Sequence, residues 1–346
     1  PIRRALAKTV LPNPRAWMVP NLRDGKFDRA EVTLKGAASF NNLANLSIGE
    51  GSGKVQVSGA RVTYIDGMPP VEGVGATATF DLKKMDVQIT GGGIGNIRLK
   101  PFTLQIEGLS EYDQIISIPM LVSGPLPEVL RLIDHPPLGY LKALGLSPDD
   151  LDGKIDGTIS FRFPLLKALA VKDIALNATA KVTGVASTKL VPGVPINQGN
   201  LDLALDTSGL TLKGRVNLGK APFQINWQEA FEAKKDKPLR QFTAKGVVRD
   251  DQWKDFGITA FNGTQGDIDV MLEMTKPDKN KTQFSGALNM TSAAVNMGIL
   301  NWKKPAKAAA ILAFSAEAVD GKPIVVSPLS LEGDQISAKG TMTLSA

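Results

Sequence analysis

Apolar and polar residues alternate with a period of two along most of this 346-residue chain. Leu201, Leu203 and Leu205 share one parity, and Asp202 and Asp206 share the other. Because successive side chains of a β-strand point to opposite faces, this pattern predicts strands with one apolar and one polar face. Over the whole chain it predicts about twenty strands, mostly antiparallel neighbours. The predicted fold class is therefore all-β.

Turn signals and a few helical segments complete the predicted elements. Three turn signals join neighbouring strands into hairpins: Ser208–Gly209, residues 277–281 and Asp320–Gly321. The clearest helical segment is residues 126–146, where Pro127 suits a first helical turn and Pro136–Pro137 interrupts an apolar stripe. A second helical segment is predicted within residues 1–23. Shorter helices are predicted at residues 164–171, 226–233 and 295–302.

The apolar face of so many strands is far larger than a few short helices can cover. A sheet buries such a face by packing as a sandwich, by closing as a barrel, or by curling lengthwise into a trough that something else fills. Sandwich cores recruit more large aromatic residues than the 6% found here. The inward positions are mainly Leu, Ile, Val and Ala, and this smooth aliphatic lining favours the trough.

The chain also shows weak internal repetition. A shift of 125 residues places Ala76, Ala78 and Phe80 on Leu201, Leu203 and Leu205. The predicted organisation has five parts: a short helical lead-in (1–26), a β-groove unit (27–125), a helical plug or connector (126–153), and two further β-groove units (154–238 and 239–346).

Composition excludes many kinds of chemistry. With no Cys and one His, His135, the chain has no disulfide, thiolate metal site, Cys nucleophile or site with two His ligands. The net charge of +6 comes from Lys and Arg spread along the chain, which is typical of a solvated surface. Aromatic residues are too sparse for base stacking, and the longest apolar run, residues 308–314, is too short to span a membrane. We expect no enzyme activity, cofactor, metal or nucleic-acid partner.

Four motifs that resemble chemical sites are better explained as turns, a sheet bend or bulge, and a surface or hinge histidine. Residues 49–54 (GEGSGK) resemble a phosphate loop but lead into a strand rather than a helix. Residues 91–95 (GGGIG) lack a βαβ context and predict a sheet bend or bulge. Residues 149–153 lack the final carboxylate of a calcium loop and predict a capped turn beginning at Ser147. Asp134–His135 precedes a helix break, and the sequence marks no nucleophile for it.

Four segments, in this order, resemble YhdP-type proteins of the AsmA-like superfamily. In residues 13–30 a Trp in a short helix precedes an Asn-Leu-x-x-Gly turn, and in residues 118–133 a strand passes through Ser-Gly-Pro into a helix. In residues 151–158 Gly-x-x-x-Gly opens a strand set, and residues 329–340 close the chain with a typical strand pair.

The resemblance implies a function as well as a fold. Members are large envelope proteins of Gram-negative bacteria, anchored in the inner membrane, whose periplasmic portion forms a taco-like groove thought to carry phospholipid towards the outer membrane. We therefore expect a long curled antiparallel sheet that forms a taco-like hydrophobic groove, with a few short helices. The chain lacks the anchor and is short, so we expect an internal periplasmic segment. Anchoring and docking functions are not carried over, and the family has no catalytic motif to transfer.

The expected partners are phospholipid acyl chains, membranes reached through parts outside this segment, and other envelope proteins. The lipid-binding residues that we predict are the inward members of the alternating pattern: Val55, Val57, Ala76, Ala78, Phe80, Val87, Ile89, Leu104, Ile106, Ile116, Ile118, Ile159, Phe161, Leu176, Leu201, Leu203, Leu205, Leu210, Leu212, Val216, Ile225, Ile268, Val270, Leu272 and Leu288. The main rival is a structural or adhesin-like β-sandwich with a dry core and no ligand. A glycan-processing enzyme would need paired carboxylates in a cleft, whereas Asp and Glu here lie mostly at outward positions.

Overall fold

Most of the described residues lie in antiparallel strands. The computed structural model describes residues 21–39, 42–65, 67–111, 113–136, 139, 141, 145–166, 173–191, 193–232, 237–259, 261, 263–319, 323–334 and 336–344. Two compact units comprise Pro1–Pro148 with Lys154–Ala180, and Asp149–Gly153 with Lys181–Ala346. One antiparallel sheet has 18 strands, and a second sheet has two. The predicted all-β class with a long antiparallel sheet is confirmed.

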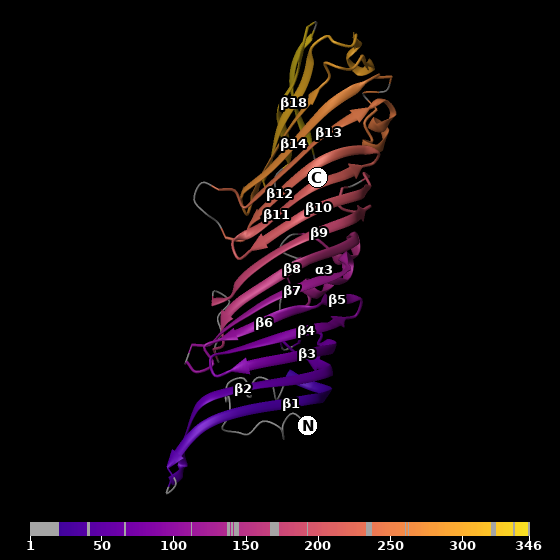
Figure 1. Ribbon diagram of the computed structural model, residues 1–346. Coiled ribbons are helices and arrows are strands. Elements are labelled where there is room, and N and C mark those ends of the chain that lie inside the picture. The colour runs from indigo at the N-terminus through magenta and orange to yellow at the C-terminus, as the bar shows by residue number, and fades with distance from the viewer. Residues whose placement is uncertain are drawn as a thin grey trace. The chain divides into compact units, whose positions relative to one another are not determined.

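In the first unit, successive strands pair antiparallel along the chain (Figure 1). They are β1 (Leu22–Ser39), β2 (Asn42–Val62), β3 (Val71–Asp81), β4 (Lys84–Ile94), β5 (Ile97–Lys100), β6 (Phe102–Glu107), β7 (Ile115–Pro125) and β8 (Asp152–Pro164). Strand β4 pairs first with β6 and then with β5. Thr90 is an extra residue between the pairs Ala76–Ile89 and Gly75–Gly91. This bulge confirms the irregularity predicted at the glycine-rich segment.

Helix α3 (Leu126–Asp134) follows β7 and confirms the first part of the helix predicted at residues 126–146. Pro127 lies in its first turn, and Leu126 is buried. The Glu128 carboxylate accepts hydrogen bonds from the backbone and side chain of Asn96 at 3.0 and 2.6 Å, which ties the helix to the turn between β4 and β5. These bonds lower the pKa of Glu128. Residues 137, 138, 140 and 142–144 lie outside the described residues.

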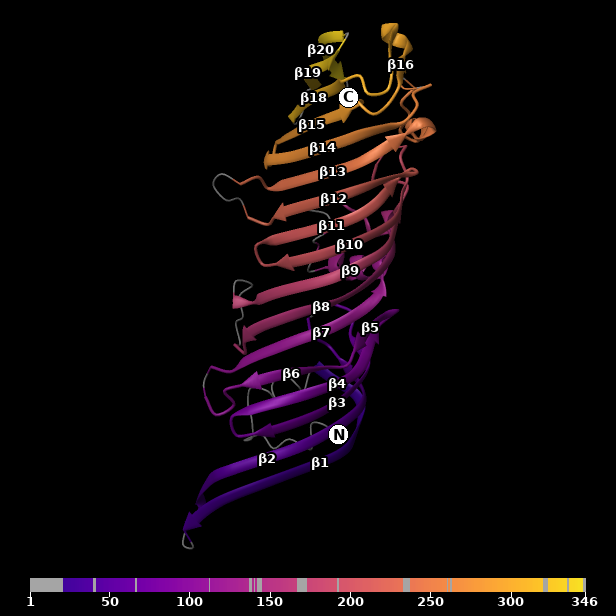
Figure 2. The same cartoon turned by 45° about the horizontal axis from the view of Figure 1, so that its top comes forward.

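Apart from one segment that lies outside the main sheet, strands also pair antiparallel along the chain in the second unit (Figure 2). Its strands are β9 (Ala175–Ser187, from Lys181 on), β10 (Ile196–Asp206), β11 (Gly209–Leu218), β12 (Ala221–Ala230), β13 (Arg240–Arg249), β14 (Asp267–Asp278), β15 (Lys281–Asn289), β18 (Ala310–Val319), β19 (Ile324–Gly333) and β20 (Ile336–Leu344). Strand β15 pairs with β18. The strands between them in the chain, β16 (Val295–Met297) and β17 (Trp302–Lys304), form the separate two-stranded sheet. The 3-10 helices among the described residues are η1 (Pro148–Asp150, at the border of the two units), η3 (Asp250–Phe256) and η4 (Gly298–Leu300).

The two segments related by the 125-residue shift form hairpins with the same register. Phe80 pairs with Met85, and Leu205 pairs with Leu210. An aspartate closes each turn: Asp81 Oδ1 accepts from the backbone N–H of Lys83 and Lys84, at 2.7 and 2.9 Å. In the other hairpin, Asp206 Oδ1 accepts from the backbone of the residues two and three positions later, at 2.7 and 3.2 Å. Such side-chain-closed turns fix the register of the strands that follow.

The other predicted turns and helices have mixed outcomes. The hairpin at residues 277–281 is present, with Asp278 opposite Lys281. Strands β18 and β19 also pair as expected, although Asp320 and Gly321 lie outside the described residues. The helix predicted at 226–233 is wrong, because β12 continues to Ala230. There, Phe223 and Ile225 alternate with polar residues, and pairing on both sides favours the strand.

The remaining helix predictions fall partly outside the described residues. At 295–302 the structure has two short strands around the three-residue η4 rather than one helix. Residues 167–171 of the predicted helix 164–171 and residues 1–20 of the lead-in lie outside the described residues. Strand β1 begins at Leu22, so the predicted helical segment does not reach residue 23. The five-part division of the chain stays a prediction.

Candidate functional site

The predicted lipid-binding residues gather on one face of the sheet in each unit, which we call the apolar face. Cross-strand pairing aligns them in rows that run across the strands. One row of the first unit is Gly53, Phe80, Met85, Ile106, Ile116 and Phe163. One row of the second unit is Leu203, Leu212, Trp227, Phe242, Met274 and Phe284. The pairing therefore brings residues from many strands into continuous apolar rows.

None of the predicted lipid-binding residues is classed as exposed, and most are only half-buried. The buried ones are Ile89, Ile106, Leu201, Val216, Ile225, Ile268, Val270 and Leu288. The others, such as Leu203 and Val87, keep part of their surface open although their strand neighbours cover their sides. Part of the aliphatic surface of this face is therefore exposed to water, and its burial by an apolar partner would be favourable.

Three phenylalanines of the apolar face lie across a glycine on the neighbouring strand. The pairs are Gly53 with Phe80, Gly246 with Phe223, and Gly286 with Phe314. A Cβ atom added to these glycines would lie 2.4, 2.6 and 2.3 Å from the facing ring. The rings therefore occupy the space above the glycines, where any larger residue would clash.

At one end of its strands the apolar face of the second unit is closed by four aromatic residues, which we call the aromatic cap: Phe223, Trp253, Phe256 and Phe261. Trp253 and Phe261 have ring centroids 4.6 Å apart, and Phe223 is 2% exposed. Ile268 at the start of β14 and Met290 are 0% exposed. This end is a packed core.

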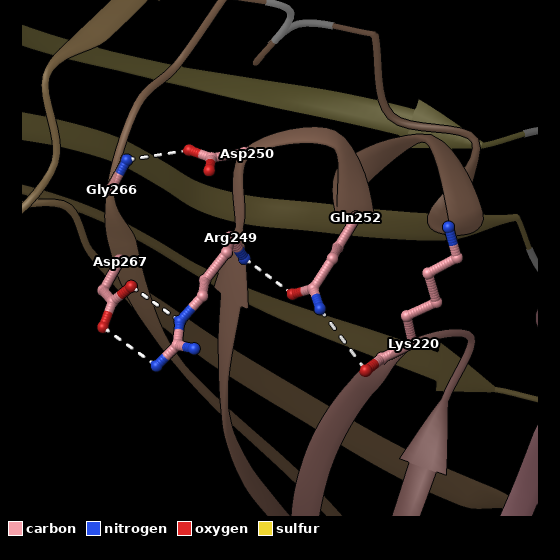
Figure 3. Close-up of polar contacts among 6 residues, drawn as sticks. All are labelled: Lys220, Arg249, Asp250, Gln252, Gly266 and Asp267. Atoms are coloured by element: carbon pink, nitrogen blue, oxygen red, sulfur yellow. Dashed lines mark hydrogen bonds and ion pairs between the residues drawn. The ribbon is translucent and has the colours of Figure 1, made fainter.

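Polar contacts hold η3, which carries part of the aromatic cap, against the strand ends (Figure 3). The Arg249 backbone donates to Gln252 Oε1 at 2.8 Å, and the Gln252 amide donates to the Lys220 carbonyl at 3.3 Å. Arg249 Nε donates to Asp267 Oδ1 at 2.8 Å, and the Gly266 N–H donates to the Asp250 carboxylate at 2.9 Å. η3 is thereby tied to the last residue of β13 and to the residues that directly precede β12 and β14.

Charged residues lie at the other end of these strands, on the same face. Glu229 is two residues beyond Trp227, and Arg240 is two residues before Phe242, so both share the apolar parity. They are opposite one another in the pairing of β12 with β13, and Arg240 is opposite Lys276 of β14. We call Trp227, Glu229, Arg240 and Lys276 the polar end. Sequence reasoning missed it and the aromatic cap.

The motifs assigned to turns contribute no site in the structure. Residues 49–54 lie within β2, and Asp149 and Asp150 form part of η1. His135 caps the C-terminus of α3, with Nδ1 2.7 Å from the Pro136 carbonyl oxygen. Among the described residues no group of three or more His, Cys, Asp or Glu is placed to hold a metal ion, and no described helix is long and apolar enough to cross a membrane.

Comparison with known proteins adds one finding. A family model described as YhdP protein matches residues 7–323, which is most of the chain. No curated protein and no solved structure matches it.

Proposed function

Because the chain belongs to the YhdP family, we propose that it is a non-enzymatic segment of a cell-envelope protein that binds phospholipid and conducts it between the inner and outer membranes. The apolar face is the surface along which the acyl chains lie. The half-buried members of the predicted set are the contact residues, and the buried members lie beside them on the same face.

The observation that carries the proposal is the half-buried state of the aliphatic rows. A face of this kind is unfavourable in water, and each CH₂ group that is buried contributes about 0.8 kcal/mol. Acyl chains supply the missing apolar partner without requiring directional contacts. Because Leu, Val, Ile and Ala recur from strand to strand, many neighbouring positions offer similar contacts to a chain that moves across them.

The dry-core sandwich is the rival proposal. A sandwich needs a second sheet of comparable size facing the first. Among the described strands, those outside the 18-stranded sheet are the three-residue β16 and β17. A sheet of that size is too small to cover the apolar rows, which favours a ligand.

The proposed location is the periplasm, as part of a protein anchored in the inner membrane by another part of its chain. Membranes are then reached through parts outside this segment, and other envelope proteins are candidate partners at its ends. These proposals rest on the family, whereas the proposed lipid contact rests also on the apolar rows.

Mass spectrometry of an organic extract from the purified chain tests the proposed function. We expect phospholipid to co-purify, and to be retained again when the delipidated protein is mixed with phospholipid vesicles and re-isolated. A stable monomer that carries no lipid after either treatment would contradict the proposal and support the dry-core sandwich.

A further inference from the structure

The polar end interrupts the apolar face at one place, on neighbouring strands. On β12, β13 and β14, the row containing Trp227, Phe242 and Met274 is apolar or aromatic, and the next row outward is Glu229, Arg240 and Lys276. The charges therefore border the apolar rows directly on the same face.

The polar contacts at this place are well formed and shielded. Arg240 Nε and Nη2 donate to the two Glu229 carboxylate oxygens at 2.6 and 3.1 Å, and Trp227 Nε1 donates to Glu229 Oε2 at 3.0 Å. The Arg240 guanidinium carbon lies 5.5 Å from the centre of the Trp227 ring. The side chains of Arg240 and Glu229 are 21% and 12% exposed, against 78% and 72% for the outward pair Lys181–Asp202.

A purely structural role does not account for the choice of residues. An ion pair that is largely removed from water gains little net stability over apolar residues of similar size, and apolar residues occupy the neighbouring row. Lys276 lies opposite Arg240, and no ion pair joins Lys276 to a carboxylate among the described residues. An additional anion would therefore be accommodated here.

We propose that the polar end binds the phosphate group of a phospholipid whose acyl chains lie on the apolar rows. Arg240 and Lys276 contact the phosphate, because a guanidinium binds phosphate oxygens in the same forked geometry in which it binds a carboxylate. Glu229 holds Arg240 in place and competes with the phosphate for it. Trp227 lies at the border between apolar rows and charges, where its ring and its N–H suit both environments.

This proposal deepens the proposed function and rests on it. Within the second unit it also gives the lipid an orientation. The acyl chains extend from the polar end towards the aromatic cap, which closes the opposite ends of the same strands. The head group stays at the polar end.

The test compares two lipids that differ only in the head group. The delipidated chain is mixed with vesicles that contain equal amounts of phosphatidylglycerol and of diacylglycerol with the same acyl chains, and the retained lipids are quantified by mass spectrometry. We expect the unmodified chain to prefer phosphatidylglycerol by about 10-fold or more, as charge-assisted hydrogen bonds imply. We expect Arg240→Gln with Lys276→Gln to abolish the preference while total retained lipid changes little.

Further variants separate the outcomes. Glu229→Gln should increase the preference for phosphatidylglycerol because it removes the competing carboxylate. If Arg240→Gln fails to fold, Lys276→Gln alone serves as the test, and it should weaken the preference. Lys245→Gln, on the opposite face of β13, is the matched control and should leave it unchanged. Equal retention of both lipids by the unmodified chain, or an unchanged preference in the double variant, overturns the phosphate proposal while leaving the proposed function intact. Loss of all lipid from the unmodified chain overturns both.

Inorganic phosphate distinguishes a lipid head group from free phosphate. It is added to the chain loaded with labelled phosphatidylglycerol, at concentrations up to the millimolar range. We expect no displacement, because the acyl chains supply most of the affinity. Displacement at these concentrations would show that the acyl chains add little to the affinity, and would overturn the assignment to a lipid in favour of free phosphate.

Discussion

The two ends of strands β12–β14 are built from the same alternating pattern but differ in how their apolar face is covered. At the aromatic cap, Phe223 and Ile268 are almost completely inaccessible, and the Phe256 ring of η3 packs edge-on against Phe223. Further along the same strands, Trp227 and Phe242 are only half-buried. The comparison shows that, among the described residues, one pattern serves as a core at the aromatic cap and as a half-buried surface further along the same strands.

The largest expected effect is a charge placed at the covered end. Ile268→Asp buries a carboxylate without a partner and should lower the free energy of unfolding by more than about 4 kcal/mol, enough to unfold the second unit. Thermal or urea unfolding followed by circular dichroism measures it. Met271→Asp, which lies on the opposite face of β14 and is exposed, is the control and should change the stability little. If Ile268→Asp and Met271→Asp have equal stabilities, the covered end is not a packed core and the two ends do not differ.

A glycine under a phenylalanine ring should show a smaller effect. Gly286→Ala places a methyl group 2.3 Å from the Phe314 ring and should destabilise the unit by about 1–3 kcal/mol as the ring is displaced. The control is Gly340→Ala, because a Cβ there meets nothing within 4 Å. Urea unfolding of both variants checks the difference, and equal stabilities would mean that the ring moves aside freely.

At the open part of the face the same charge should be tolerated. Leu203→Asp should cost only about 1 kcal/mol, because water relaxes around a half-buried carboxylate, but it should reduce photocrosslinking to acyl chains. Ala204→Asp points to the other face and should change neither measurement. If Leu203→Asp unfolds the unit and the unmodified chain forms no lipid crosslink, this part of the face is a dry core as well.

The smallest effect is expected at the hairpin turn of β3 and β4. Hydrogen bonds from the backbone of Lys84 and Lys83 hold the pKa of Asp81 below its usual value of 3.8. A depressed pKa in the folded state means that the contribution to stability is present above the unfolded-state pKa and is lost as the pH falls through the folded-state value. Asp81→Ala should therefore flatten the pH dependence of the unfolding free energy in the acid range. Unfolding titrations between about pH 6 and pH 2 measure it, and an unchanged slope would contradict the assignment.

The parts of the fold that were predictable from sequence depend on local periodicity. Leu203 and Leu205 show their common face without any knowledge of their neighbours, because side chains of a strand alternate. The hairpin around Ser208–Gly209 was predictable for the same reason, since its signal lies within a few residues. The family resemblance was likewise recognisable from short segments in their order.

The parts that were missed depend on contacts between distant segments. Trp253 and Phe261 meet only after η3 has folded back over the strand ends, and their spacing resembles that of ordinary loop residues. Trp253 and Phe256, three residues apart after two acidic residues, were the available signal for a helical turn. Glu229 and Arg240 lie next to each other only through the register of β12 and β13. Residues 226–233 were wrongly predicted as a helix for the same reason. A single segment does not show which strands it pairs with.

If the apolar face conducts lipid as proposed, the rings that lie on glycines bear on how fast a bound acyl chain can move. A phenylalanine ring that projects from the apolar face would be an obstacle, and an acyl chain that moves past it would have to cross an energy barrier. Phe314 instead lies over Gly286, in space that a larger residue would fill. Each additional 1.4 kcal/mol of barrier slows such a step by about tenfold, so the proposed lipid conduction should be faster over this ring than over a projecting one.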